Sequence, residues 1–314
     1  MADQSYNAVI IAVVAVFVTL TVVTTAFRLY TKVVAVKKSG WEDWLMCVAT
    51  VGLVTICGAG AGSLSLGLLQ HTKDIPRHDL IALGNVINVI VFVYIPAIAF
   101  TKLSILLQMT RIFIPIHGTK SFYAMLAFIT INMLYYLADF IAQFVACFPR
   151  SKTMNEEIPG MCEIWLVNSI LSGVFNMVSD FSMLAMPIFW ITRLHMSTGR
   201  KVVASAVFTV GILACAASTT RLVFSIKYML NTSEDEMDSN VRLALCRTSE
   251  VTAGIVCGNL PSLPAFIRHA RGKDQSSGVV VQAKPRGGDL EKLPSMPDKM
   301  PELVFLAGAR GEVI

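Results

Sequence analysis

Three acids and two arginines fall within long apolar stretches of this 314-residue sequence: Asp139, Asp180, Glu250, Arg221 and Arg247. An ionisable side chain is expensive inside a membrane and usually faces a charged partner or a wet cavity. A carboxyl group can donate or accept a proton, and an arginine can stabilise developing negative charge. The acids are therefore the candidate catalytic residues, and the arginines are candidate ligand-binding residues.

Helical spacing gathers further polar side chains around these five, because residues three or four apart share one face of a helix. The expected polar stripes are Asn132, Tyr136, Asp139 and Gln143; Ser169, Ser172, Asn176 and Asp180; Ser218, Arg221 and Ser225; and Arg247 with Glu250. Two interpretations stay open. The stripes either form an ion-pair network that locks the helices together, or they line a ligand cavity in which Asn176 joins the arginines as a binding residue.

The elements that carry these stripes follow from composition. The chain is 54% hydrophobic and only 15% charged, whereas soluble domains carry about 25% charge. Seven apolar runs have the length of about 20 residues that a bilayer-spanning helix needs: 8–27, 44–68, 80–109, 122–148, 166–191, 202–226 and 243–267. Strands of a membrane barrel need only about 10 residues, so the sequence predicts an all-α, seven-helix transmembrane bundle over residues 1–267.

Basic residues indicate the orientation of this bundle, because Lys and Arg near the membrane are retained in the cytoplasm. An outside N-terminus places 12 of the basic residues near the membrane on the cytoplasmic side and six on the other. The C-terminus is then cytoplasmic, and residues 268–314, rich in Gly, Pro, Ser and charge, are expected to form a disordered tail. The net charge of +5 is explained by topology, so we expect the lipid bilayer and no nucleic acid as a partner.

Several single residues carry further expectations. Cys147 and Cys162 flank the outer loop between the fourth and fifth helices, where a disulfide would persist, and Asn231 begins a glycosylation sequon on the same side. Lys102 is expected to extend to the inner membrane interface. The small-residue run 58–62 predicts close helix packing. The five histidines are scattered, so no metal site is expected.

Spaced motifs connect this chain to a known family. The segments are Phe27-Arg28-Leu29-Tyr30-Thr31, Gly40-Trp41-Glu42-Asp43-Trp44, residues 101–113, Ser179-Asp180 with Pro187 and Trp190, and Glu250 with Gly254, Leu260 and Pro261. Together they resemble the fungal rhodopsin-domain family of seven-helix proteins, which includes the satratoxin-cluster membrane proteins. The resemblance covers residues 25–267 and implies either a receptor-like protein or a protein encoded beside a secondary-metabolite pathway.

The residues narrow the function that this resemblance implies. A retinal protein needs a Schiff-base lysine in its last helix, and residues 243–267 contain no lysine, so we expect neither retinal nor another cofactor. The first hypothesis is a polytopic membrane protein of a fungal secondary-metabolite pathway that binds an apolar small molecule or pathway intermediate and catalyses its cyclisation or isomerisation. The alternative is a receptor-like ligand sensor in signalling, and a transporter is a third. Whether the chain is an enzyme stays open.

Overall fold

The computed structural model describes residues 2–35, 37, 39–64, 76–113, 119–145, 163–191, 198–230, 236–263 and 266. Within these ranges the chain forms seven α-helices and no strand. The helices are α1 (Ala2–Tyr30), α2 (Trp41–Leu64), α3 (Arg77–Phe113), α4 (Lys120–Val145), α5 (Glu163–Ile191), α6 (Thr198–Leu230) and α7 (Glu236–Asn259). The all-α class predicted from the sequence is confirmed.

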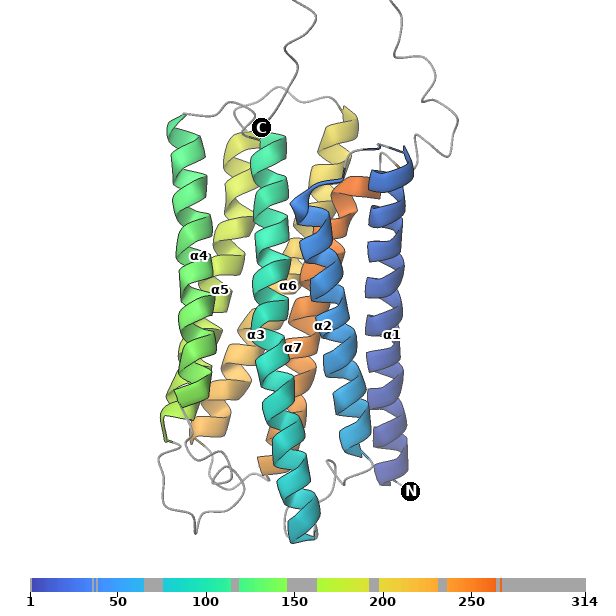
Figure 1. Ribbon diagram of the computed structural model, residues 1–314, viewed down its shortest axis with the longest axis vertical. Helices are drawn as coiled ribbons and strands as arrows, with labels where there is room; N and C mark the ends of the chain where they lie inside the picture. Colours follow the sequence, from blue (N-terminus) through green and yellow to red (C-terminus); the bar gives the residue numbers. More distant parts are fainter. Residues whose placement is uncertain are drawn as a thin grey trace, which may run out of the picture. The chain divides into compact units, whose positions relative to one another are not determined.

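The helices lie side by side, and successive helices run in opposite directions (Figure 1). Helix α3 packs against α2, α4, α5 and α7, and α7 also packs against α1, α2 and α6. A π-helical turn, Thr31–Ala35, continues α1, and a 3-10 turn, Leu260–Ser262, continues α7. Helices α3 and α7 therefore hold the positions from which side chains reach most of the other helices.

The bundle interior holds polar side chains beside an apolar core, and the exposed faces of the helices carry many apolar side chains. On α4 the buried residues include Asn132, Asp139 and Gln143, as the predicted stripe required, while Leu134 and Ile141 on the opposite face are 60% and 55% exposed. Apolar side chains can contact the lipid tails directly. A polar group in the membrane instead needs a hydrogen-bond partner inside the protein. The lipid-facing and core-facing sides of the helices could therefore be predicted from spacing.

Six of the described helices are long and apolar enough to cross a bilayer, over residues 8–34, 41–63, 81–111, 120–145, 167–186 and 208–230. Helix α7 is the exception. Its buried positions include Ser239, Thr248, Glu250, Thr252 and Asn259, so its polar side chains face the other helices. The sequence predicts seven membrane spans, and the length and composition of the described helices support six of them.

One packing prediction is wrong for the glycines of the run. A Cβ built at Gly58, Gly60 or Gly62 would meet no atom within 4 Å, so the close helix contact is not made there, although Ala59 between them packs against the hydrophobic core. The close approach lies six residues earlier, where a Cβ at Gly52 would be 3.0 Å from that of Ala97 on α3. The sequence shows that this run consists of small residues, but it does not show which face of α2 the glycines occupy.

Other predictions fall outside the described residues. These are the tail 268–314, the Cys147–Cys162 disulfide and the sequon at Asn231. Of the other cysteines, Cys47, Cys57, Cys215 and Cys246 are free thiols, as expected for small packing residues.

A polar network and a pocket inside the bundle

An ion pair between Lys102 of α3 and Asp180 of α5 occupies the buried interior. The Lys102 Nζ atom lies 2.8 Å from Asp180 Oδ1, and the two side chains are 2% and 7% exposed. Lys102 also donates to the side-chain oxygen of Asn176 at 3.1 Å and to its backbone carbonyl at 3.3 Å. Lys102 therefore does not extend to the interface, because an acid and an amide within its reach satisfy the ammonium group inside the bundle. These contacts join α3 to α5, which agrees with a structural role for this lysine.

A second ion pair joins α6 to α7. The Arg221 Nη1 atom lies 3.3 Å from Glu250 Oε2, and both side chains are buried. The Tyr94 hydroxyl donates to the same carboxylate oxygen at 2.8 Å. Ser218 contacts Oδ2 of Asp180 and donates to Oε1 of Glu250 at 3.0 Å. One serine thus connects the two ion pairs into a continuous network.

Two tyrosines extend this network. The Tyr136 hydroxyl donates to Oδ1 of Asn176, whose Nδ2 lies 3.5 Å from the Tyr94 hydroxyl. Tyr136 belonged to a predicted stripe, but Tyr94 and Lys102 did not. The signal that could have found them is their own spacing, because positions eight apart on α3 differ by about 80° around the helix axis and so fall within one polar stripe.

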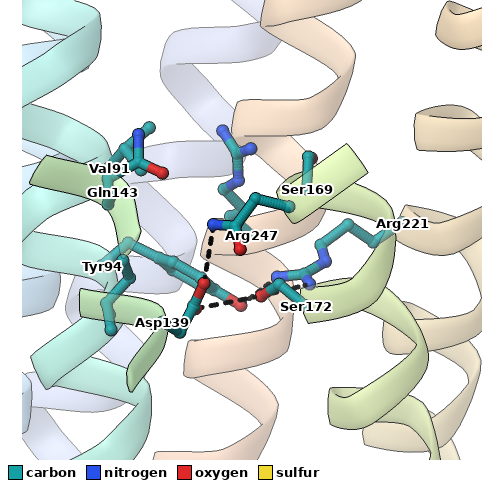
Figure 2. A pocket seen from close by; sticks show the side chains of 10 residues that line it. Val91, Tyr94, Asp139, Gln143, Ser169, Ser172, Arg221 and Arg247 are labelled. Atoms are coloured by element: carbon teal, nitrogen blue, oxygen red, sulfur yellow. Dashed lines mark hydrogen bonds between the residues drawn. The ribbon is translucent and has the colours of Figure 1, made fainter. Parts of the chain in front are cut away.

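Beside the network lies a pocket whose walls come from five helices (Figure 2). Its lining residues are Val91, Tyr94 and Ile95 of α3, Asp139 and Gln143 of α4, Asn168, Ser169 and Ser172 of α5, Arg221 of α6 and Arg247 of α7. The hollow measures about 320 Å³ with its open mouth included. Its enclosed part accommodates about one water molecule in this conformation.

Asp139 enters the pocket with neutral partners only. Asn168 Nδ2 donates to Oδ1 at 2.9 Å, and Ser172 Oγ donates to Oδ2 at 3.3 Å. No cation of the described ranges lies within ion-pairing distance of this carboxylate. Figure 2 shows Asp139 facing Ser172 across the pocket, with Arg247 on another wall.

Arg247 is the other charged group of the lining that lacks a counterion. Its guanidinium lies 5.9 Å from the centre of the Tyr94 ring, while that of Arg221 lies 5.4 Å from the same centre. The Arg247 side chain is half-buried, and it forms no hydrogen bond or ion pair with any residue that the structure describes. The pocket thus presents one carboxylate and one guanidinium that are not paired with each other.

The candidate residues therefore separate into two groups. Asp139, Arg221 and Arg247 line the pocket, whereas Asp180, Glu250 and Asn176 lie in the neighbouring network and do not line it. Arg221 belongs to both groups, because it lines the pocket and also pairs with Glu250. Both interpretations of the polar stripes thus keep support: an ion-pair network joins the helices, and a pocket lies beside it.

A second polar cluster joins four helices through Arg28 of α1. Its Nε donates to Asp43 Oδ1 of α2 at 2.8 Å, and its Nη1 donates to Gln108 Oε1 of α3 at 2.8 Å and to the carbonyl of Gly258 in α7 at 2.6 Å. Arg111 adds an ion pair with Glu42 at 2.7 Å. The motif segments 27–31, 40–44 and 101–113 thus meet here, which indicates that they position helices.

Comparison with known proteins agrees with this architecture. The fungal rhodopsin domain matches residues 27–269. A SAT4 family membrane protein of Emericella nidulans is 30% identical over 276 residues, which cover 88% of this chain and 66% of that protein. Fugralins biosynthesis cluster protein 2 of Gibberella zeae is 23% identical over 79% of this chain and 63% of its own length. Wortmanamides biosynthesis cluster protein C of Talaromyces wortmannii is 23% identical over 80% of this chain and 68% of its own length. The chain therefore spans about two thirds of the length of these relatives.

Proposed function

We propose a function on the premise that the chain belongs to the fungal rhodopsin domain family and is an integral, multi-pass membrane protein. In this proposal it serves a fungal secondary-metabolite pathway and binds an apolar small molecule in the pocket between α3, α4, α5, α6 and α7. The names of two relatives, both biosynthesis cluster proteins, support the assignment to a pathway.

The observation that carries the proposal is the unpaired charge in the pocket. Lys102, Asp180, Arg221 and Glu250 all have an ion-pair partner, but Asp139 has none among the described residues. A buried charge without a counterion is costly, and membrane proteins retain such groups mainly at functional sites. The pocket is therefore the favoured site of function, and the network beside it is its scaffold.

The pocket also carries groups that a proton transfer requires. An isomerisation or cyclisation can proceed when a base removes a proton from one atom of the substrate and returns it to another, without any net change in oxidation state. Asp139 is the candidate acid and base, and its hydrogen bonds from Asn168 and Ser172 orient its carboxyl group. Arg221 and Arg247 are placed to stabilise negative charge that develops on the substrate.

The proposed topology has seven spans with the N-terminus outside. Helix α7 is included because it packs against α1, α2, α3 and α6 and turns its polar side chains toward them. In this orientation the pocket lies in the outer half of the membrane, because its lining includes Gln143 near the end of α4 and Asn168 near the start of α5. These helix ends lie on the same side of the bundle as the beginning of α1 (Figure 1).

Gene deletion with metabolite profiling in the native host tests the proposal. We expect the deletion to abolish one family of products, and Asp139→Asn to reach normal membrane abundance without restoring them. Asp79→Asn is the matched control, because Asp79 lies at the start of α3 beside His78 and outside the pocket, and it should restore the products.

The same experiment separates the alternatives. An unchanged set of metabolites in the deletion strain would refute the pathway assignment. If the deletion changed only the transcriptional response to added metabolites, the receptor-like alternative would replace the present proposal. Full complementation by Asp139→Asn would remove this carboxyl group from the site.

A further inference from the structure

The charges of the bundle interior are unevenly matched. Lys102 pairs with Asp180 and Arg221 pairs with Glu250, which leaves Asp139 and Arg247. Both oxygens of Asp139 already accept a hydrogen bond from a neutral donor. Arg247 has no acceptor among the described residues, so its N–H groups are available to donate hydrogen bonds to a ligand.

The two arginines of the pocket differ in this respect. The Nη1 atom of Arg221 contacts Glu250 and the Tyr94 hydroxyl, and its Nη2 lies 3.4 Å from Ser172 Oγ. A guanidinium group carries five N–H donors in a fixed fork, and those of Arg247 point to no described acceptor. Both cations lie within 6 Å of the centre of the Tyr94 ring, so an anion beside Arg247 would also relieve the repulsion between them.

We infer that the ligand of this pocket is an apolar molecule that ends in an oxyanion, such as a carboxylate or an enolate, and that Arg247 binds this group. The inference rests on the proposed function and adds the chemical class of the ligand. Gln143 supplies a second donor from α4, and Val91 and Ile95 offer apolar contact to the carbons next to the headgroup. In this conformation the enclosed part of the pocket holds about one water molecule, so only the oxyanion oxygens would enter it and the rest of the ligand would lie outside.

The test measures binding to the full chain in nanodiscs of zwitterionic phosphatidylcholine, with hexanoate and hexan-1-ol as probes of equal chain length. Isothermal titration at neutral pH gives both dissociation constants. A charge-assisted hydrogen bond contributes enough for us to expect hexanoate to bind about tenfold more tightly than hexan-1-ol. Arg247→Met should abolish this preference, so that hexanoate binds no more tightly than hexan-1-ol, whereas Arg247→Lys should retain part of it.

Two controls keep the result interpretable. Arg111→Met removes an arginine whose side chain is 43% exposed and pairs with Glu42, and it should keep the preference for hexanoate. Circular dichroism and thermal unfolding establish whether each variant is folded. If Arg247→Met does not fold, Arg247→Gln replaces it as the test variant.

Three outcomes would overturn the inference. Equal affinities of the wild-type chain for the two probes would refute an oxyanion ligand while leaving an apolar ligand in place. A preference that persists in Arg247→Met and Arg247→Gln would refute the role of Arg247. Binding of neither probe would refute the inference too, and the separate metabolite profile would then decide the proposed function.

Discussion

Replacing Lys102 by methionine removes one charge of a buried ion pair and keeps a side chain of similar length. The Nζ atom lies 2.8 Å from Asp180 Oδ1, with exposures of 2% and 7%. At this distance and an effective dielectric constant of about 20, the Coulomb attraction is about 6 kcal/mol. Desolvation of the two ions offsets part of it, and removing one partner of a buried pair costs about 3 to 5 kcal/mol. We expect Lys102→Met to lower the free energy of unfolding by that amount.

A double-mutant cycle isolates the pair. Asp180→Asn combined with Lys102→Met removes both charges, so the double variant should be less destabilised than the sum of the single variants by at least about 2 kcal/mol. The matched control is Arg111→Met, whose ion pair with Glu42 is 43% exposed on the arginine side and should contribute less than about 1 kcal/mol.

The measurement is unfolding of the purified chain in maltoside micelles titrated with sodium dodecyl sulfate and followed by far-ultraviolet circular dichroism. Two results would refute the reasoning. One is Lys102→Met within about 1 kcal/mol of the wild type, the range expected of an exposed pair. The other is strict additivity of the two single substitutions, which would mean that Lys102 and Asp180 do not interact.

Three further predictions concern packing, covalent structure and topology. Gly52→Val should cost about 1 to 3 kcal/mol by overpacking the α2–α3 contact, whereas Gly58→Val, at an open and exposed position, should not; equal losses of thermal stability would contradict this. Non-reducing peptide mass spectrometry should recover Cys147 linked to Cys162, closing a loop that stabilises by about 3 kcal/mol in the chain-entropy model; two free thiols in fresh membranes would refute the bridge. An accessible tag beside Asn231 should be labelled from outside while a C-terminal reporter is active in the cytosol; the reverse pattern would invert the topology.

The polar stripes on α4 to α6 could be predicted from the sequence because each lies on one helix and recurs every three or four residues. Asp139 illustrates this: its stripe is the buried face of α4. Lys102 could not be placed in the same way, because a lone lysine near the end of an apolar run is compatible with two surroundings. The choice between them depended on Asp180, which comes from another helix.

The contacts of Arg28 could not be predicted from the sequence for a related reason. Arg28 meets Asp43, Gln108 and the carbonyl of Gly258, which lie 15, 80 and 230 positions away along the chain. No periodicity connects such partners, and a basic residue at a helix end is equally well explained by topology. The motif residues were visible, but their role in joining helices emerges only from the packing.

The seventh helix has a consequence for how this protein reaches the membrane. Helix α7 carries Arg247 and Glu250, and each charge near a helix centre costs about 2.5 to 3.5 kcal/mol on insertion scales. In the proposed seven-span topology, α7 would enter the membrane together with α6, whose Arg221 pairs with Glu250. The two helices would then insert as one helical hairpin. Substitutions at Arg221 should accordingly appear as failed membrane insertion of the C-terminal segment and rapid degradation during synthesis.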